Sequence, residues 1–256
     1  WATDTARGAN QYTFANSGVK GNDGDPGKTD QHPVTNINWR DALVWCNALT
    51  EWYNAENGTS YACVYTSDEE YDDPIRTCTD STSITASTDG SQDKPYINPD
   101  AKGFRLPTLA EWSCAARYKG SDSSNDAYEY PADSGNYWTP GDYASGADAD
   151  YNDATETGKV AWYSSNSSSS THVAGTAGNG GGAVRSGNAN ALGLFDVSGN
   201  VREWNFDWHP SHVESRRMIR GGSWSNSADY VQVGSWGSDL PYLEYSRIGF
   251  RFTRTQ

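Results

Sequence analysis

The apolar residues of this chain recur with a helical period in two stretches. In residues 38–54 they return every three or four positions, which predicts a helix with Asn38 as its N-cap. Its predicted apolar face consists of Ala42, Trp45, Cys46, Leu49, Trp52 and Tyr53. A second helix is predicted from Thr108, because Thr108 and Glu111 have the spacing of a capping box and Pro107 keeps the preceding backbone extended.

Most other apolar residues lie in short runs bounded by Gly, Asn, Ser or Pro, which predicts short strands. These runs are residues 160–163, 193–197, 201–208, 217–224 and 248–253. Three long polar stretches lie near residues 64–100, 121–158 and 164–190, and we expect them to be surface insertions. The pattern predicts an α+β fold in one domain spanning residues 1–256, with two helices, small twisted antiparallel sheets and many loops.

Composition indicates a core built from aromatic rings. Hydrophobic residues make up 35% of the chain, yet 11 Trp, 16 Tyr and 6 Phe are present, so large flat side chains must provide much of the burial. We expect this core to include Trp112, Trp204, Trp208 and Trp224.

Net charge argues against a nucleic-acid partner, and hydropathy argues against a membrane-spanning segment. A net charge of −14 argues against a nucleic-acid partner, because phosphate binding relies on Lys and Arg. No apolar run approaches the roughly 20 residues that cross a bilayer. The chain starts at Trp1 with neither an initiator Met nor a signal peptide, as expected of a mature or trimmed form.

The four cysteines of the chain can be free thiols or form disulfides. Cys46 and Cys114 fall in the predicted helices, where a buried small apolar side chain is expected. Cys63 and Cys78 flank an acidic stretch, and they either close it by a disulfide or remain free.

The sequence contains no recognised catalytic or metal-binding motif, so no catalytic residue is predicted. The four histidines show no metal-ligand spacing, and Asp207 near His209 is interpreted as a surface feature. A nucleophile elbow, a P-loop and a dinucleotide fingerprint are all missing. The calcium tripeptides EPN and QPD of sugar-binding lectins are also missing. Residues 21–27 and 148–153 offer oxygen ligands but lack the spacing of a calcium-binding EF-hand loop.

Five phrases carry a family resemblance. PVTNINWRDALVWCNAL, GFRLPTLAEWSCAAR, NALGLFDVSGNVREW, RGGSW and IGFRF occur in this order between Pro33 and Arg254. Together they resemble the formylglycine-generating-enzyme, or sulfatase-modifying-factor, domain. The resemblance implies the variant of the C-type lectin fold that this family adopts. We expect Arg105, Arg220 and Arg251 to fork between backbone carbonyls and carboxylates in it.

The resemblance also implies one metal position and weakens one activity. Asn200 and Glu203 occupy positions similar to a structural calcium site, with a turn-anchoring carboxylate as the alternative. No other cofactor is expected. Aerobic members of the family carry two redox-active cysteines after RGGS that bind copper. Asn226 and Val231 stand about there in this chain, so that chemistry lacks its thiolate ligands.

One branch of the fold resembles this chain further. The variable proteins of diversity-generating retroelements, including the treponemal surface lipoproteins, have a segment from RGGSW to GFR that is rewritten by mutation at adenines. Here that segment is residues 220–251, and its middle part shows neither helical nor strand periodicity. Adenine changes in asparagine codons yield most of its residues, and an arginine AGG codon yields Trp236. Gln232 and Glu244 would be fixed positions, and Val231–Val233 would be a fixed strand.

The resemblance and the residue types together predict a binding site. Tyr and Trp give rigid contact area, whereas Ser, Gly and Asp give adaptable hydrogen bonds, as in antibody paratopes. The predicted ligand-binding residues are Ser225, Asn226, Ser227, Asp229, Tyr230, Ser235, Trp236, Gly237, Ser238, Asp239, Leu240, Tyr242, Leu243, Tyr245, Ser246 and Arg247. Tyr230, Trp236, Tyr242 and Tyr245 would be the anchors.

These patterns favour a non-enzymatic ligand-binding protein with a retroelement-diversified site. By the resemblance, it would be a bacterial lipoprotein on the extracellular side of the outer membrane, attached only by a lipid anchor absent from this chain. Its ligand is expected to be a protein rather than a sugar. Two alternatives stay open: an oxygen- or thiol-dependent enzyme with a relocated site, and a non-variable adhesive surface protein.

Overall fold

A four-stranded sheet lies at the centre of the molecule. In the computed structural model, which describes residues 1–22 and 27–255, the strand order is β11-β10-β9-β12. The strands are β9 (Arg202–Trp208), β10 (Arg217–Arg220), β11 (Trp236–Asp239) and β12 (Ile248–Phe250). β9, β10 and β11 form antiparallel pairs, whereas β12 runs parallel to β9. Residues 23–26 of the oxygen-rich stretch at 21–27 lie outside the described residues.

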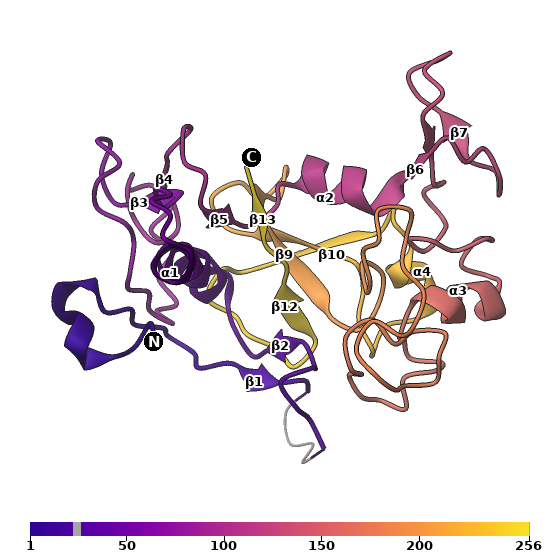
Figure 1. Cartoon of the computed structure of the whole chain (residues 1–256), viewed down its shortest axis with the longest axis horizontal. Helices are drawn as coiled ribbons and strands as arrows, with labels where there is room; N and C mark the ends of the chain where they lie inside the picture. The colour runs from indigo at the N-terminus through magenta and orange to yellow at the C-terminus, as the bar shows by residue number, and fades with distance from the viewer. Residues whose placement is uncertain (23–26, 256) are drawn as a thin grey trace.

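The two predicted helices flank this sheet, and both begin with capping boxes (Figure 1). They are α1 (Trp39–Asn57), capped by Asn38, and α2 (Leu109–Arg117), capped by Thr108. Two shorter helices, α3 (Ala154–Val160) and α4 (Ala228–Val231), and a 3-10 segment at Thr5–Asn10 were not predicted. No helix in the described part of the chain is long and apolar enough to cross a bilayer.

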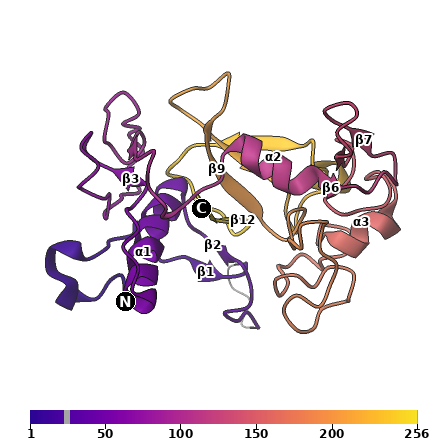
Figure 2. The same cartoon turned by 45° about the horizontal axis from the view of Figure 1, so that its top comes forward.

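The remaining strands form short ladders around the central sheet (Figure 2). The pairs are β1 (Val19–Lys20) with β2 (Val34–Thr35), β3 (Tyr65–Thr66) with β4 (Tyr96–Ile97), and β5 (Phe104–Arg105) with β13 (Thr253–Arg254). A further sheet has the order β6 (Tyr118–Gly120), β8 (Tyr137–Trp138), β7 (Tyr128–Glu129). Small antiparallel sheets and few helices confirm the predicted α+β class.

Two predicted strands are wrong, because side chains rather than neighbouring strands satisfy their backbone. In residues 160–163, Val160 ends α3, and the Asn166 side chain then bonds the carbonyl of Ala161 and the amide of Tyr163. In residues 193–197, Asn190 Oδ1 accepts from the amide of Leu194, and Arg251 donates to two carbonyls. These segments are ordered loops.

The aromatic core is confirmed for two of its four predicted members. Trp112 and Trp204 are almost fully buried, whereas Trp208 and Trp224 are only half-buried. Trp39 is a further buried ring that was not predicted. Trp204 packs with Ile219 and Ile248, so the sheet and α1 share one core.

The predicted apolar face of α1 is partly wrong. Trp45 and Trp52 are 36% and 41% exposed, whereas Arg40, Asp41 and Asn47 are buried. The buried polar groups have partners: Asp41 accepts from the amide of Ala15, and Asn47 donates to the carbonyl of Tyr65. Neighbouring loops therefore bury the polar side of this helix, which hydrophobic periodicity cannot reveal.

The cysteines are free. Cys63 and Cys78 are buried without a disulfide, and each thiol donates elsewhere, to the carbonyl of Asn47 and to Asp41 respectively. Cys114 is exposed, contrary to expectation, because α2 buries the side that carries Trp112 and Ala116.

One buried ion pair joins α1 to the loop between β3 and β4. Arg40 Nε donates to Asp93 Oδ1 at 2.7 Å, and both side chains are 0% exposed. Arg40 also donates to the carbonyls of Thr79 and Ser81. Each charge is therefore compensated by the other, and removing one leaves an unpaired buried ion.

We expect Asp93→Asn to lower the free energy of unfolding by about 3–5 kcal/mol, because Arg40 would stay buried and charged. The control is Asp89→Asn, because the side chains of Asp89 and its partner Lys94 are 60% and 43% exposed, and the expected loss is below about 1 kcal/mol. Chemical denaturation measures both values. Equal effects from the two variants would contradict the assignment.

Candidate functional site

The segment at residues 225–247 is more regular than its sequence indicates. It contains α4 and β11, and β11 pairs with β10 from Arg220↔Trp236 to Arg217↔Asp239. The predicted strand at Val231–Val233 is wrong, since Val231 ends α4. Val231 and Val233 are both buried, and they fix the segment to the core between its exposed parts.

The backbone of the 225–247 segment is held from outside at several points. Arg220 donates to the carbonyls of Val233 and Ser235, and the amide of Val233 donates to the carbonyl of Tyr143. Further along, the amide of Trp39 donates to the carbonyl of Pro241. The path of this segment is therefore determined by residues outside its sequence, which we call the frame: Arg220 of β10, Tyr143, and Trp39 of α1.

Gly222 lies in the connection between β10 and α4, at a position that requires glycine. Its φ is +70°, and an added Cβ would lie 2.6 Å from the carbonyl oxygen of Tyr230. Only glycine combines that backbone conformation with such a close approach. The RGGSW phrase thus brings α4 against the end of β10.

Several predicted binding residues gather around Arg202 of β9. Its Nε donates to Asn226 Oδ1 at 3.0 Å, and its guanidinium lies 5.5 Å from the ring of Tyr230. A Cβ added at Gly237 would lie 2.9 Å from Arg202 Nη1, so this face of β11 borders the same side chain. Burial, with Arg247 nearby, lowers the pKa of Arg202. The site therefore has a positive centre within a strongly acidic chain.

A second aromatic part of the site combines Arg247 with Tyr245. The Arg247 guanidinium lies 4.5 Å from the Tyr245 ring centre, and burial together with Asp239 raises the pKa of Tyr245. Asp239 also pairs with Arg216 at 3.6 Å. These contacts hold the C-terminal end of the segment close to the edge of the sheet.

Trp236 points away from the side of β11 that borders Arg202. Side chains alternate along a strand, so Trp236 and Ser238 lie on the opposite face of β11 from Gly237 and Asp239. The Trp236 ring is 57% exposed and lies 5.1 Å from the ring of His209. Trp236 therefore faces another direction than the part of the site around Arg202. The fourth predicted anchor, Tyr242, lies with its ring 5.8 Å from the Arg40 guanidinium.

The predicted residues differ widely in accessibility. The exposed ones are Ser225, Ser227, Asp229, Tyr230, Trp236 and Arg247. The half-buried ones are Asn226, Ser235, Gly237, Ser238, Asp239, Leu240, Tyr242, Leu243, Tyr245 and Ser246. The exposed residues lie at both ends of the segment and at the start of β11.

The two residues proposed for calcium already have protein partners. Both oxygens of Glu203 accept from Arg251, at 2.6 and 2.7 Å, and Oε2 also accepts from the Trp112 indole at 2.7 Å. The Asn200 amide bonds the backbone of His172 and the carboxylate of Asp196. Glu203 therefore fits the alternative of an anchoring carboxylate.

The predicted arginine forks are present at Arg105 and Arg251. Arg105 contacts both oxygens of Glu111 and holds the pKa of that carboxyl down at about 2. Arg220 differs, since it binds backbone carbonyls and Ser113, and its guanidinium lies 4.6 Å from the Trp112 ring centre. All three hold the frame together.

Residues 4–256 match the sulfatase-modifying factor enzyme 1-like domain. The chain belongs to this family. The finding confirms the resemblance carried by the five phrases and the predicted formylglycine-generating-enzyme type of fold.

Individual relatives of this sulfatase-modifying-factor-type chain include solved structures. Treponema denticola variable protein 1 is 31% identical, with a TM-score of 0.62 over 89% of this chain and 73% of that one. CarF is 25% identical, with a TM-score of 0.62 over 96% of this chain and 77% of that one. The first match confirms the predicted resemblance to the treponemal variable proteins.

A curated relative is described as chaperone protein LppX from Paenibacillus barcinonensis. It is 31% identical over 219 residues, which cover 80% of this chain. The chain spans 64% of the length of that relative.

The positions that the resemblance assigns to redox cysteines have other roles in this family member. Asn226 Oδ1 accepts from the amide and hydroxyl of Ser223 as well as from Arg202. Val231 is fully buried. Elsewhere, burial raises the pKa of Cys63 to about 12 and also raises the pKa values of Cys46 and Cys78. Their thiolates are disfavoured as nucleophiles or metal ligands.

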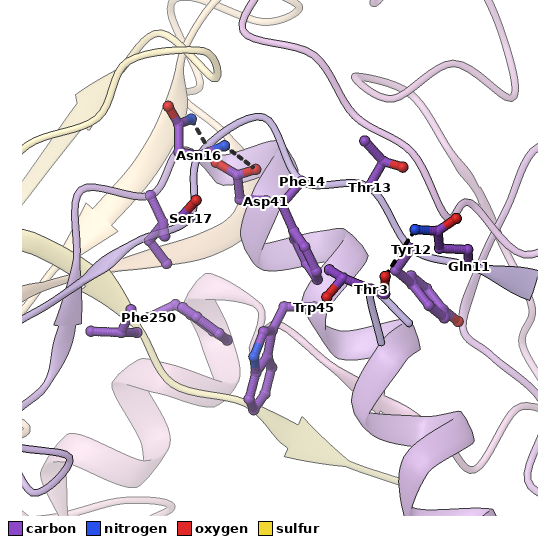
Figure 3. Close-up of a pocket in the computed structure, with 12 residues that line it drawn as sticks. Thr3, Gln11, Tyr12, Thr13, Phe14, Asn16, Ser17, Asp41, Trp45 and Phe250 are labelled. Carbon is purple, nitrogen blue, oxygen red and sulfur yellow. Dashed lines mark hydrogen bonds between the residues drawn. The ribbon is translucent and has the colours of Figure 1, made fainter. Parts of the chain in front are cut away.

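A pocket of about 710 Å³ lies elsewhere, between the N-terminal segment, α1 and β12. Figure 3 shows Trp45 and Phe250 along one part of its wall, with rings 5.1 Å apart, and Asp41 bonded to Asn16 at another. The 225–247 segment contributes no lining residue. The pocket and the predicted binding surface are therefore separate features.

Asn226 is expected to be structural although it lies among the predicted contact residues. Replacing it with Ala removes the acceptor for Arg202 and Ser223 and should lower the free energy of unfolding by about 1–3 kcal/mol. Ser227→Ala is the neighbouring control, with an expected change below about 0.5 kcal/mol at an exposed position. Urea denaturation compares them, and a neutral Asn226→Ala would contradict the role.

Proposed function

We propose that this chain is a non-enzymatic protein that binds a ligand through the 225–247 segment. The observation that carries the proposal is the pairing of exposed aromatic rings with a restrained backbone. Tyr230 and Trp236 are 45% and 57% exposed, while Arg220 and Val233 tie the same stretch to the frame. A restrained segment loses little conformational entropy when it binds.

The residue chemistry favours a protein ligand. Exposed Tyr and Trp rings are common at the energetic centres of protein interfaces. Arg202 and Arg247 add positive charge, so an acidic patch on the partner would be complementary. Because the anchors face two directions, we expect the ligand to contact the edge of β11 on both sides.

We further propose that a retroelement diversifies this segment and that the protein is displayed at the cell surface. The support is the similarity to a protein described as variable protein 1 and the location of the predicted changeable residues. In this proposal a lipid anchor attached outside these 256 residues holds the protein on the extracellular side of the outer membrane. In this proposal the frame supports the binding segment and takes no part in a reaction.

The diversification is tested by sequencing the DNA beside the gene. We expect a near-copy of the stretch encoding residues 220–251, next to a reverse transcriptase, that differs almost solely at adenines. A neighbourhood without such a copy would remove the diversification, and the binding proposal would then rest on the protein experiment below.

In this proposal the exposed anchors Tyr230 and Trp236 vary, so both must be dispensable for folding. We expect Tyr230→Ala and Trp236→Ala each to change the free energy of unfolding by less than about 1 kcal/mol, because both side chains are exposed at the surface. Trp204→Ala, in the core, should cost about 3–5 kcal/mol. Thermal and chemical denaturation measure all three. Loss of the fold in the two surface variants would overturn this assignment of the binding surface.

A further inference from the structure

The loop between β9 and β10 brings two histidines together. His209 directly follows β9, and the amide of His212 donates to the carbonyl of His209 at 2.9 Å, closing a turn with Pro210 at its second position. Proline favours that position because its φ is preset. Figure 2 shows this connection, in orange, projecting beyond β9. The turn explains why an H-P-S-H sequence without a recognised metal motif places two imidazoles side by side.

The two rings face each other through the same kind of atom. His209 Nδ1 and His212 Nδ1 lie 3.0 Å apart, and the ring centres are 4.7 Å apart. His209 Nδ1 also accepts from the amide of Ser211 at 3.1 Å. One lone pair on His209 is thus shared by two donors when His212 carries its proton on Nδ1.

We propose that His209 and His212 bind a divalent transition-metal ion of the Cu²⁺ or Ni²⁺ class through their Nδ1 atoms, with both rings then carrying their proton on Nε2. Imidazole nitrogen is a preferred ligand for these ions, and tetragonal geometry is typical of them. Two nitrogens about 2.1 Å from one ion and about 90° apart are about 3.0 Å from each other. The observed spacing equals that value.

The residues around the two histidines determine how many coordination positions of the ion stay open. Within residues 1–22 and 27–255 no group of three or more His, Cys, Asp or Glu is placed to hold a metal. The histidine pair would therefore leave coordination positions to water or to a side chain from another molecule. His209 is almost buried and its ring contacts Trp236, so the ion would lie beside one anchor of the predicted binding surface.

The test is isothermal titration of untagged protein with NiCl₂ and CuCl₂. We expect one saturable site, which His212→Ala weakens at least tenfold. Losing even a supporting partner of a metal ligand lowers affinity by about 10–100-fold. His212 is exposed, so this variant should stay folded. His32→Ala, at a histidine in another loop, is the matched control and should retain the wild-type affinity.

A second readout locates the ion. Cu²⁺ should quench tryptophan fluorescence on binding, and Trp236→Phe should reduce the quenching while leaving the calorimetric affinity unchanged. His209→Asn, checked by thermal melting, should weaken binding at least tenfold, as His212→Ala does. Unchanged affinity in His212→Ala, or equal losses in His212→Ala and His32→Ala, would overturn the proposal. So would the lack of saturable binding in the wild type.

Discussion

The buried guanidinium of Arg220 is the contact on which the candidate site depends. It lies at the end of β10, faces the Trp112 ring of α2, and donates to Ser113 and to the carbonyls of Val233 and Ser235. Burial lowers its pKa to about 10, so it remains charged at neutral pH. One side chain thereby fixes the separation between a helix, a core strand and the 225–247 segment. Without those donors, two carbonyls would have to find other partners at the edge of the sheet.

Hydrogen bonds from side chains to the backbone also occur where the sequence predicts strands that do not form. Asn166, Asn190 and Arg251 satisfy backbone groups that a strand would pair with a neighbour. Short ladders and long loops can therefore remain ordered, since each loop has local side-chain partners. Some of the polar residues with such partners are fully buried, as Arg40 and Asp41 are on α1.

What the sequence predicts well is local. The N-cap at Asn38, the capping box at Thr108 and the strand at β9 depend on neighbouring residues, and each appears where expected. The buried side of α1 was mispredicted because Asp41 and Asn47 meet partners far along the chain. The resemblance identified the 225–247 segment, but its strand depends on pairing with β10. The His209–His212 pair was missed because a turn, rather than a metal-ligand spacing, brings the two rings together.

The alternation of β11 has a consequence for recognition. Gly237 and Asp239 face the side of Arg202, whereas Trp236 faces the side of His209. β11 is the outer strand of its sheet, so both faces meet at one edge. A ligand that lies flat on one face of β11 contacts the side chains of that face alone. A ligand that follows the edge of the strand contacts Arg202, Tyr230 and Trp236 together. Substitutions on one face would then alter one set of contacts while the pairing of β11 with β10 keeps the other in place.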